Sequence, residues 1–439
     1  MTVSAGMLTV IMFGAIFVLM VTGLPIAYSV GAAGMAAALL LWGPQALYIT
    51  YFGTSSITSS FVLLALPLFI FMGCILQGAN FAEDLFHCAY NLLGGIPGGL
   101  AVGCVLICLL IAAMVGVSSA ATISLGIMAI PPMMARGYDK KLITGTIQAG
   151  GALGFLIPPS VSMVSYAFVS GTSLARLFAG GVFPGLMLAI MYIIYILIRC
   201  RIQPKLGPPI PKAERATGKE KASSLRGIII PLCLIFLVLG TIFFGICSPT
   251  EAAAVGCLGS LVCAYFKKRL TKKIIWTAMT TTLKLVGMVA WIVVAATCFS
   301  KVYNALGASK MIQAFIGNAG INSWVVLICI QLSFFILGMF LDDGAILFVC
   351  MPVYIPIVQM LGFDTVWFAI LYIVNMQCAF LTPPFGYNLF YIRSVAPPEI
   401  TLKDIYISVL PYIALQILGL IIIMIFPQIV TWLPTKMFG

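Results

Sequence analysis

The sequence predicts an all-α protein that crosses a membrane many times and is built from two inverted repeats. Of the 439 residues, 62% are hydrophobic and only 8% are charged, too few charges to cover a soluble protein of this length. Apolar windows of about 20 residues recur, and each is long enough to span a hydrocarbon core of roughly 30 Å. One long polar linker, residues 199–226, separates two halves of similar size, residues 1–198 and 227–439.

Basic residues are concentrated in two segments. Residues 199–226 hold eight of the 23 lysines and arginines, and the run KKRLTKK at 267–273 holds five more. Basic loops beside membrane spans mark the cytoplasmic side, so we expect both segments there, and we expect no nucleic-acid partner. Proline, lysine and glycine dominate the linker, which predicts an extended and mobile segment.

The two halves contain an internal repeat. Residues 114–160 match residues 339–385 at ten of 47 positions without a gap, at a constant shift of 225. The matches include the prolines of FLIPP (155–159) and FLTPP (380–384). The connection MMARGYDKK of the first repeat is basic, whereas its counterpart VQMLGFDTV carries no base. The positive-inside rule then predicts opposite orientations, an arrangement typical of secondary transporters.

Each repeat contains a helix pair followed by an interrupted helix. We expect the pairs at about 98–135 and 323–360, and a double crossing or a re-entrant hairpin fits the topology equally well. The interrupted helices are expected at about 140–172 and 365–396. Prolines remove backbone donors and glycines admit a ligand close to the backbone, so such breaks are tolerated where they line a polar cavity. Freed carbonyl oxygens suit Na⁺, and opposed helix N-termini favour anions.

An acidic pair interrupts the second helix pair. Asp342 and Asp343 lie within an apolar run, where each carboxylate near the bilayer centre costs on the order of 3 kcal/mol. A cation or proton site at a hairpin tip explains them, and a salt bridge or an interfacial loop is the alternative. The same place in the first repeat carries Ser118, Ser119 and Thr122. Elsewhere, the stretch SPTEAAA predicts a helix-capping box from Ser248 to Glu251.

Three stretches resemble the large membrane subunit of the tripartite ATP-independent periplasmic (TRAP) transporters. They are GGALGFLIPPS (150–160), FLDDGAILF (340–348) and CAFLTPPFGYNLFYIRSVAP (378–397). The resemblance implies an elevator-type transporter of the bacterial inner membrane, with two re-entrant hairpins and two broken helices in a moving domain. It implies Na⁺-driven uptake of an organic anion, such as sialic acid or a C4-dicarboxylate. It also implies two partners, a separate small membrane subunit of about four helices and a periplasmic substrate-binding protein.

The resemblance also assigns site residues, and Na⁺ is the only metal ion expected, with no other cofactor. The first Na⁺ site would comprise Ser118, Ser119, Gly150, Gly154 and Pro158. The second would comprise Asp342, Asp343, Gly344, Gln377, Thr382 and Gly386. The substrate carboxylate would lie between them, near Ser160, Asn388 and Arg393.

Other functions remain as alternatives. The sequence shows no catalytic constellation and no phosphate-binding loop, so we expect no enzyme. A channel would also use broken helices, but saturable coupling to Na⁺ would distinguish a transporter from it. A proton-coupled carrier or an ion transporter of another inverted-repeat family is the main alternative.

Overall fold

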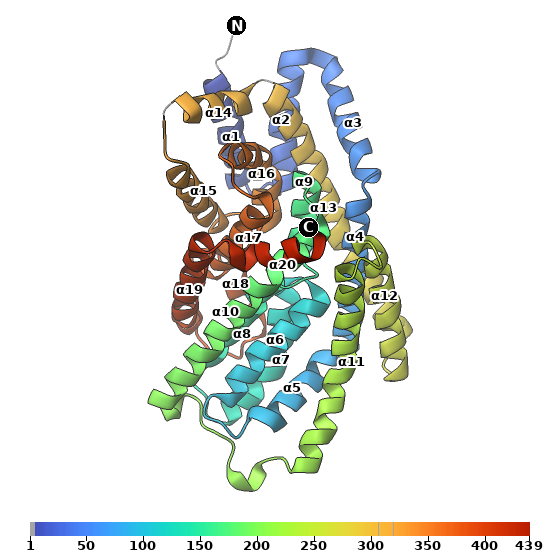
Figure 1. Cartoon of the computed structure of the whole chain (residues 1–439), viewed down its shortest axis with the longest axis vertical. Coiled ribbons are helices and arrows are strands. Elements are labelled where there is room, and N and C mark those ends of the chain that lie inside the picture. The colour runs from blue at the N-terminus through green and yellow to red at the C-terminus, as the bar shows by residue number, and fades with distance from the viewer. Residues whose placement is uncertain (1–4, 306, 319) are drawn as a thin grey trace.

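The computed structural model describes residues 5–305, 307–318 and 320–439, and every regular element within them is a helix (Figure 1). The prediction of an all-α protein is confirmed. Nine helices of the described residues are long and apolar enough to cross a membrane, as expected of a multi-pass membrane protein.

The helices fall into two series that follow the two halves of the chain. The first series is α1 (Ala5–Val21), α2 (Ile26–Trp42), α3 (Ala46–Thr58), α4 (Phe61–Gly78), α5 (Phe81–Leu93), α6 (Gly99–Val115), α7 (Ser118–Ala135), α8 (Lys140–Ala152), α9 (Val161–Ser170) and α10 (Leu174–Ile202). The second is α11 (Gly218–Phe243), α12 (Pro249–Phe266), α13 (Lys272–Ala305), α14 (Ala308–Asn318), α15 (Ser323–Gly338), α16 (Asp343–Met360), α17 (Thr365–Leu381), α18 (Tyr387–Val395), α19 (Leu402–Ile425) and α20 (Gln428–Phe438).

Helix boundaries in the two halves repeat at the predicted spacing. Helices α7 and α16 both begin and end 225 residues apart, and so do the first residues of α8 and α17. An aspartate caps each of the latter pair. The Asp139 carboxylate accepts from the backbone amide of Leu142 at 3.0 Å, and that of Asp364 accepts from the amide of Trp367 at 2.8 Å. The repeat therefore extends to the local interactions that start the helices.

The capping box predicted at the start of α12 is also present. The Ser248 hydroxyl accepts from the backbone amide of Glu251, and the Glu251 carboxylate accepts from the amide of Ser248 at 2.8 Å. Two amides that the helix leaves without partners are thereby satisfied.

Both helices that contain the proline pairs are interrupted. Helix α8 tightens into a short 3₁₀ turn at Leu153–Phe155, and the next helix, α9, starts only at Val161. Helix α17 ends at Leu381 and α18 starts at Tyr387. The Pro158–Pro159 and Pro383–Pro384 peptide bonds are both cis.

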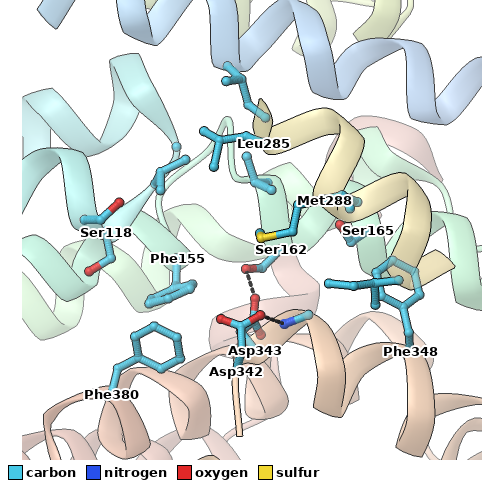
Figure 2. A pocket seen from close by; sticks show the side chains of 18 of the residues that line it. Ser118, Phe155, Ser162, Ser165, Leu285, Met288, Asp342, Asp343, Phe348 and Phe380 are labelled. Atoms are coloured by element: carbon cyan, nitrogen blue, oxygen red, sulfur yellow. Dashed lines mark hydrogen bonds between the residues drawn. The ribbon is translucent and has the colours of Figure 1, made fainter. Parts of the chain in front are cut away.

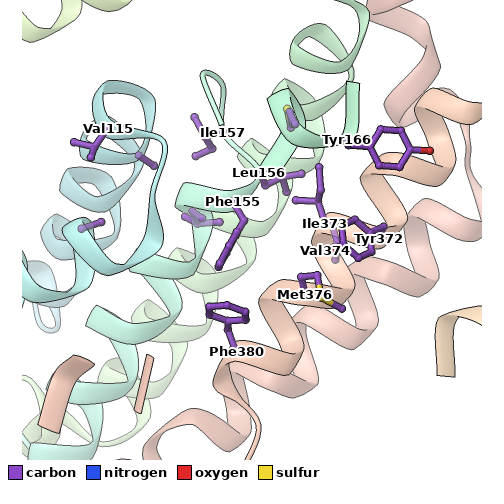
Figure 3. Packing of buried hydrophobic residues seen from close by; sticks show 14 of the residues in the cluster. Val115, Phe155, Leu156, Ile157, Tyr166, Tyr372, Ile373, Val374, Met376 and Phe380 are labelled. Carbon is purple, nitrogen blue, oxygen red and sulfur yellow. The ribbon is translucent and has the colours of Figure 1, made fainter. Parts of the chain in front are cut away.

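The two interruptions meet at the centre of the molecule. Phe155 and Phe380 occupy equivalent positions of the repeat, and their rings pack edge to face with centroids 4.6 Å apart (Figure 3). Helix α17 is buried from Val366 to Leu381, so it is covered on every side. Around this centre, the long helix α13 packs along α2 and α4 and also reaches α16.

The linker is shorter and more firmly attached than predicted. Residues 199–202 complete α10, and α11 begins at Gly218, so 203–217 are the connecting residues. The backbone amides of Gly98 and Asp139 donate to the carbonyls of Gly207 and Leu206, at 2.8 and 2.9 Å. The Ile210 side chain is 3% exposed. The backbone of this linker bonds to the turns beside the first helix pair, which was not expected, and its mobility stays a prediction.

The basic loop at 267–273 is attached to the first turn of α5. Lys267 forms an ion pair with Asp84 and lies over the ring of Phe81. Arg269 donates to both carboxylate oxygens of Asp84, at 3.1 and 3.2 Å. The linker meets the other end of the same helix, since the amide of Ile210 donates to the carbonyl of Gly94 at 2.7 Å. Both basic segments therefore lie against α5 and the turn that follows it.

Candidate functional site

A cavity of about 170 Å³ lies where the two helix pairs turn and the first broken helix resumes (Figure 2). One wall is made by the turn before α7, the start of α9 and the start of α16. The opposite wall is apolar and comes from α13, through Leu285, Met288, Val289 and Ile292. Its hydroxyl and carboxylate lining consists of Ser118, Ser119, Ser162, Ser165, Asp342, Asp343 and Tyr391.

Asp343 is held by two hydroxyl groups. The Ser162 hydroxyl donates to its Oδ2 atom at 2.5 Å, and the Tyr372 hydroxyl donates to Oδ1 at 2.7 Å. The carboxylate is 8% exposed, so these bonds replace water that burial has removed. Asp342 caps α16 by accepting from the amide of Gly344 at 3.1 Å.

A second polar group lies at the tip of the first helix pair. The Ser118 hydroxyl donates to the side-chain oxygen of Asn388 at 2.9 Å, and the Asn388 amide donates to the carbonyl of Gln148 at 3.2 Å. All three residues are buried. The chain thus connects α7, α8 and α18 through one asparagine.

These contacts cross between the repeats. Ser118 and Asp343 occupy equivalent positions, as the first residues of α7 and α16. Their partners are also equivalent, because Asn388 and Ser162 are each the second residue of the helix that follows a break. Each helix pair therefore bonds, by side chains, to the broken helix of the other repeat.

Three helix N-termini line the cavity. Helices α7, α9 and α16 begin at Ser118, Val161 and Asp343, and all three residues line it. The N-terminal end of a helix carries a partial positive charge and free amide donors. An anion in this cavity would therefore be favoured by the helices, while the two aspartates at α16 would oppose it.

A family model described as "Tripartite ATP-independent periplasmic transporter, DctM component" matches residues 13–429. The chain belongs to this family. This DctM-family chain is 31% identical to a C4-dicarboxylate TRAP transporter large permease protein of Vibrio cholerae, over 99% of both chains. It is also 31% identical to the sialic acid TRAP transporter permease protein SiaT of Haemophilus influenzae, over 85% of this chain and 60% of the relative.

The fold agrees with a solved transporter structure. The YdaH transporter of Alcanivorax borkumensis aligns with a TM-score of 0.66 over 91% of this chain and 90% of that one, at 16% identity. At this identity the similarity concerns the fold alone. The family is described as a transporter component, and the relatives are named as transporter permeases.

Two of the residues predicted for the first Na⁺ site, Ser118 and Gly154, lie against each other in this DctM-family chain. An added Cβ on Gly154 would lie 3.1 Å from the amide nitrogen of Ser118, so the backbones of the two segments are in close contact. The amide of Val161 donates to the carbonyl of Gly116 at 3.2 Å, across the same contact. Ser119 lines the cavity, whereas Gly150 packs on Cys108 and Pro158 is buried in the break.

The residues predicted for the second site are divided between two places. Asp342, Asp343 and Gly344 line the cavity. Gln377 is fully buried, and its side-chain atoms have no hydrogen-bond partner among the described residues. Thr382 donates to the carbonyl of Cys378 at 2.7 Å, and Gly386 packs on the carbonyls of Phe380 and Thr382. Neither Gln377, Thr382 nor Gly386 lines the cavity with the aspartates.

Two of the predicted substrate residues have structural partners instead. Ser160 caps α9, and its hydroxyl donates to the carbonyl of Phe155 at 2.5 Å. Arg393 donates to the carbonyl of Ile400 at 2.9 Å and does not line the cavity. Asn388 remains beside the site through its bond to Ser118.

The residues of this site that were not predicted are Ser162, Ser165, Tyr372 and Tyr391. Ser162 and Ser165 are three residues apart, which is a signal that they share one side of α9. Tyr372 lies within the apolar run of α17, and nothing in its local sequence distinguishes it from a core tyrosine.

Proposed function

We propose that this chain catalyses no reaction but moves an organic anion inward together with Na⁺. The observation that carries the proposal is the cavity, in which three helix N-termini and two carboxylates surround one small space. C4-dicarboxylates and sialic acid, which the similar permeases are named for, are the substrate candidates.

The charges in the cavity explain why an anion would need a cation. The described residues that line the cavity include Asp342 and Asp343 but no lysine or arginine. A substrate carboxylate about 4 Å from an aspartate would be repelled by roughly 4 kcal/mol at an effective dielectric constant of about 20. A Na⁺ ion bound at the aspartates would remove this repulsion, and the helix N-termini would then attract the substrate. By linkage, the substrate would then strengthen Na⁺ binding to the same extent.

Several buried oxygen atoms near the hairpin tips have no donor among the described residues. They are Thr122 Oγ1, Gln148 Oε1 and Gln377 Oε1. Thr122 lies against the backbone of Gly151, at the contact between α7 and α8. Buried oxygens without donors are costly, and hard oxygen ligands suit Na⁺. They support Na⁺ sites at both hairpins without assigning each ligand.

The proposal includes the partners and the location implied by the family. A periplasmic substrate-binding protein would deliver the anion. A small membrane subunit of about four helices would extend the helices that do not move with the hairpins and broken helices. The chain would lie in the bacterial inner membrane, with residues 199–226 and 267–273 in the cytoplasm. The attachment of both basic segments around α5 supports their lying on one side. One net charge entering across 100 mV supplies about 2.3 kcal/mol.

Uptake of labelled succinate and N-acetylneuraminate into proteoliposomes tests the proposal. The chain is reconstituted with its small subunit, and the cognate binding protein is added outside. We expect uptake of one of the two anions only when an inward Na⁺ gradient and the binding protein are both present. Uptake that is indifferent to both would contradict the tripartite mechanism.

Two variants test the ion sites. We expect both Asp343→Asn and Ser119→Ala to raise the half-saturating Na⁺ concentration. For Asp343→Asn, which loses a charged ligand, the increase should be on the order of tenfold. Glu399→Gln is the control, because Glu399 is exposed and does not line the cavity. Unchanged Na⁺ affinity in both site variants would remove the proposed ion sites.

A proton-coupled carrier is the second candidate, because the same aspartates could bind protons instead of Na⁺. Uptake driven by an inward proton gradient in Na⁺-free buffer, with Asp343→Asn inactive, would favour that carrier over the Na⁺ mechanism.

A further inference from the structure

A second cavity, of about 360 Å³, is lined in part by the last turns of α13. These turns lead to α14, at the end of the molecule opposite the linker between α10 and α11 (Figure 1). The same three helices, α9, α13 and α16, line both cavities. Phe348 belongs to both linings and is only 3% exposed, so its ring separates them. We call this space the outer cavity.

The two cavities carry opposite charge. Among the described residues, Lys301 in the last turns of α13 is the only charged one that lines the outer cavity. Its side chain is exposed, and no carboxylate of the described residues lies within ion-pair distance. The central cavity has the reverse charge, since the part of the chain that the structure describes lines it with Asp342 and Asp343 and with no basic residue.

The outer cavity also offers polar groups next to the lysine. Thr297, Ser300 and Asn304 line it from the same helix. The Thr297 hydroxyl donates to the carbonyl of Val293 at 2.7 Å, and the Asn304 amide donates to the Ser300 hydroxyl at 3.4 Å. The Ser300 hydroxyl and the second amide hydrogen of Asn304 remain able to donate to a carboxylate. The volume falls in the range of small-molecule pockets.

We propose that the outer cavity is a receiving subsite, where Lys301 binds the carboxylate of the organic anion before it passes Phe348. This inference rests on the proposed function and adds a station to it. An anion would reach a positively charged site first and would enter the acidic central cavity only when cations have bound there. Lys301 would thereby raise the local concentration of substrate beside Phe348 without holding the substrate in the central cavity.

Uptake kinetics test the subsite, using whichever of succinate or N-acetylneuraminate the unaltered assembly transports. The uptake rate is measured against the concentration of loaded binding protein for Lys301→Gln, Lys301→Arg and the control Lys403→Gln, whose side chain is exposed. We expect Lys301→Gln to lower the maximal rate about tenfold, the loss of one charge-assisted contact, at an unchanged half-saturating concentration. Lys301→Arg should retain most of the rate.

Two results would overturn the subsite. An unaltered maximal rate in Lys301→Gln would show that the lysine does not receive the anion. A raised half-saturating concentration of binding protein, with the maximal rate unchanged, would assign Lys301 to docking of that protein instead.

A second measurement does not depend on transport. Lys301 and Lys403 are acylated in detergent by an N-hydroxysuccinimide ester, and the modified peptides are quantified by mass spectrometry. We expect succinate or N-acetylneuraminate to slow acylation of Lys301 several-fold and to leave Lys403 unaffected. Equal rates with and without both anions would refute the subsite, whereas protection without Na⁺-coupled uptake would refute only the proposed function.

Discussion

Single hydroxyl groups determine how the buried Asp343 carboxylate is held. Ser162 and Tyr372 approach it from α9 and α17, so one charge connects three helices. A hydrogen bond to a buried charged group contributes about 1.5–3 kcal/mol to stability. The same two hydrogen bonds therefore shape the cavity and connect the three helices that pack around it.

Removing the tyrosine hydroxyl should therefore destabilise the protein. We expect Tyr372→Phe to lower the free energy of unfolding by about 1–3 kcal/mol, because Asp343 loses its Oδ1 partner while the ring stays in place. The thermal transition of the detergent-solubilised chain measures this. In the Asp343→Asn background the same change should cost less, and an equal cost in both backgrounds would show that the two groups do not interact.

A glycine at the tip of the first helix pair is required by its conformation and by its neighbour. Gly116 has φ +69°, and an added Cβ would overlap the carbonyl oxygen of Pro159. Gly137 has a similar φ of +76° but nothing within 4 Å of an added Cβ. The left-handed conformation alone costs a non-glycine residue about 1–2 kcal/mol.

A comparison of Gly116 with Gly137 separates the cost of the left-handed conformation from the cost of the contact with Pro159. We expect Gly137→Ala to lower the melting temperature slightly and Gly116→Ala to lower it much more, since only the latter displaces the break from the hairpin tip. Thermal unfolding of both variants, followed by tryptophan fluorescence, checks this. Equal shifts would mean that the contact with Pro159 contributes nothing to stability.

At the level of elements, the sequence predicted the breaks well and their partners poorly. Proline pairs and glycines act on the nearest turn of backbone, so their positions alone located both interruptions. The bond of Ser118 to Asn388 spans 270 residues, and its direction depends on how the repeats are arranged against each other. The resemblance placed each hairpin tip against the break of its own repeat. The structure adds the bonds of Ser118 and Asp343 to the other repeat, beside the bond of Tyr372 to Asp343 within the second.

The attachment of the linker was not predicted, for a related reason. Its composition is typical of mobile segments. Composition does not show which backbone amides and carbonyls elsewhere in the chain will bond to the segment. Gly207 lies so close to Gly98 that an added Cβ would be 2.9 Å from its Cα atom. The ion pair of Arg136 with Glu214, 2.5 Å long, adds a contact between a half-buried arginine and an exposed glutamate. Backbone bonding, rather than this ion pair, should hold the segment.

Limited proteolysis tests whether the linker is held in this way. We expect Gly207→Val to speed tryptic cleavage after Lys205 and Lys212 several-fold, because the side chain would displace the segment from the turn at Gly98. Gly218→Val is the control, since nothing lies within 4 Å of an added Cβ there. Equal cleavage in both variants would indicate that the contact does not restrict the linker.

At the scale of the whole molecule, the central cavity lies at a boundary between two groups of helices. Hairpin and broken-helix residues form its polar wall, and α13 forms its apolar wall. The hairpin and broken-helix residues could slide along this apolar wall without breaking specific contacts, because the wall offers no hydrogen bonds. The proposed elevator motion needs such a boundary, and the sequence alone could not locate it, since apolar residues like those of α13 that line the cavity occur in many of the spans.

A covalent link across this boundary should stop transport. An added Cβ on Gly344 would lie 4.0 Å from the Cδ1 atom of Ile292, so Ile292→Cys with Gly344→Cys places two thiols within reach of a mercury ion. Gly31→Cys with Ala295→Cys is the matched control, because it links α13 to α2, with an added Cβ on Gly31 3.3 Å from that of Ala295. In a background without other reactive cysteines, we expect mercury to abolish Na⁺-dependent uptake only in the first pair, and a reducing thiol to restore it. Continued uptake with the first pair linked would mean that α13 and the tip of α16 move together, which would place the moving boundary elsewhere in the molecule.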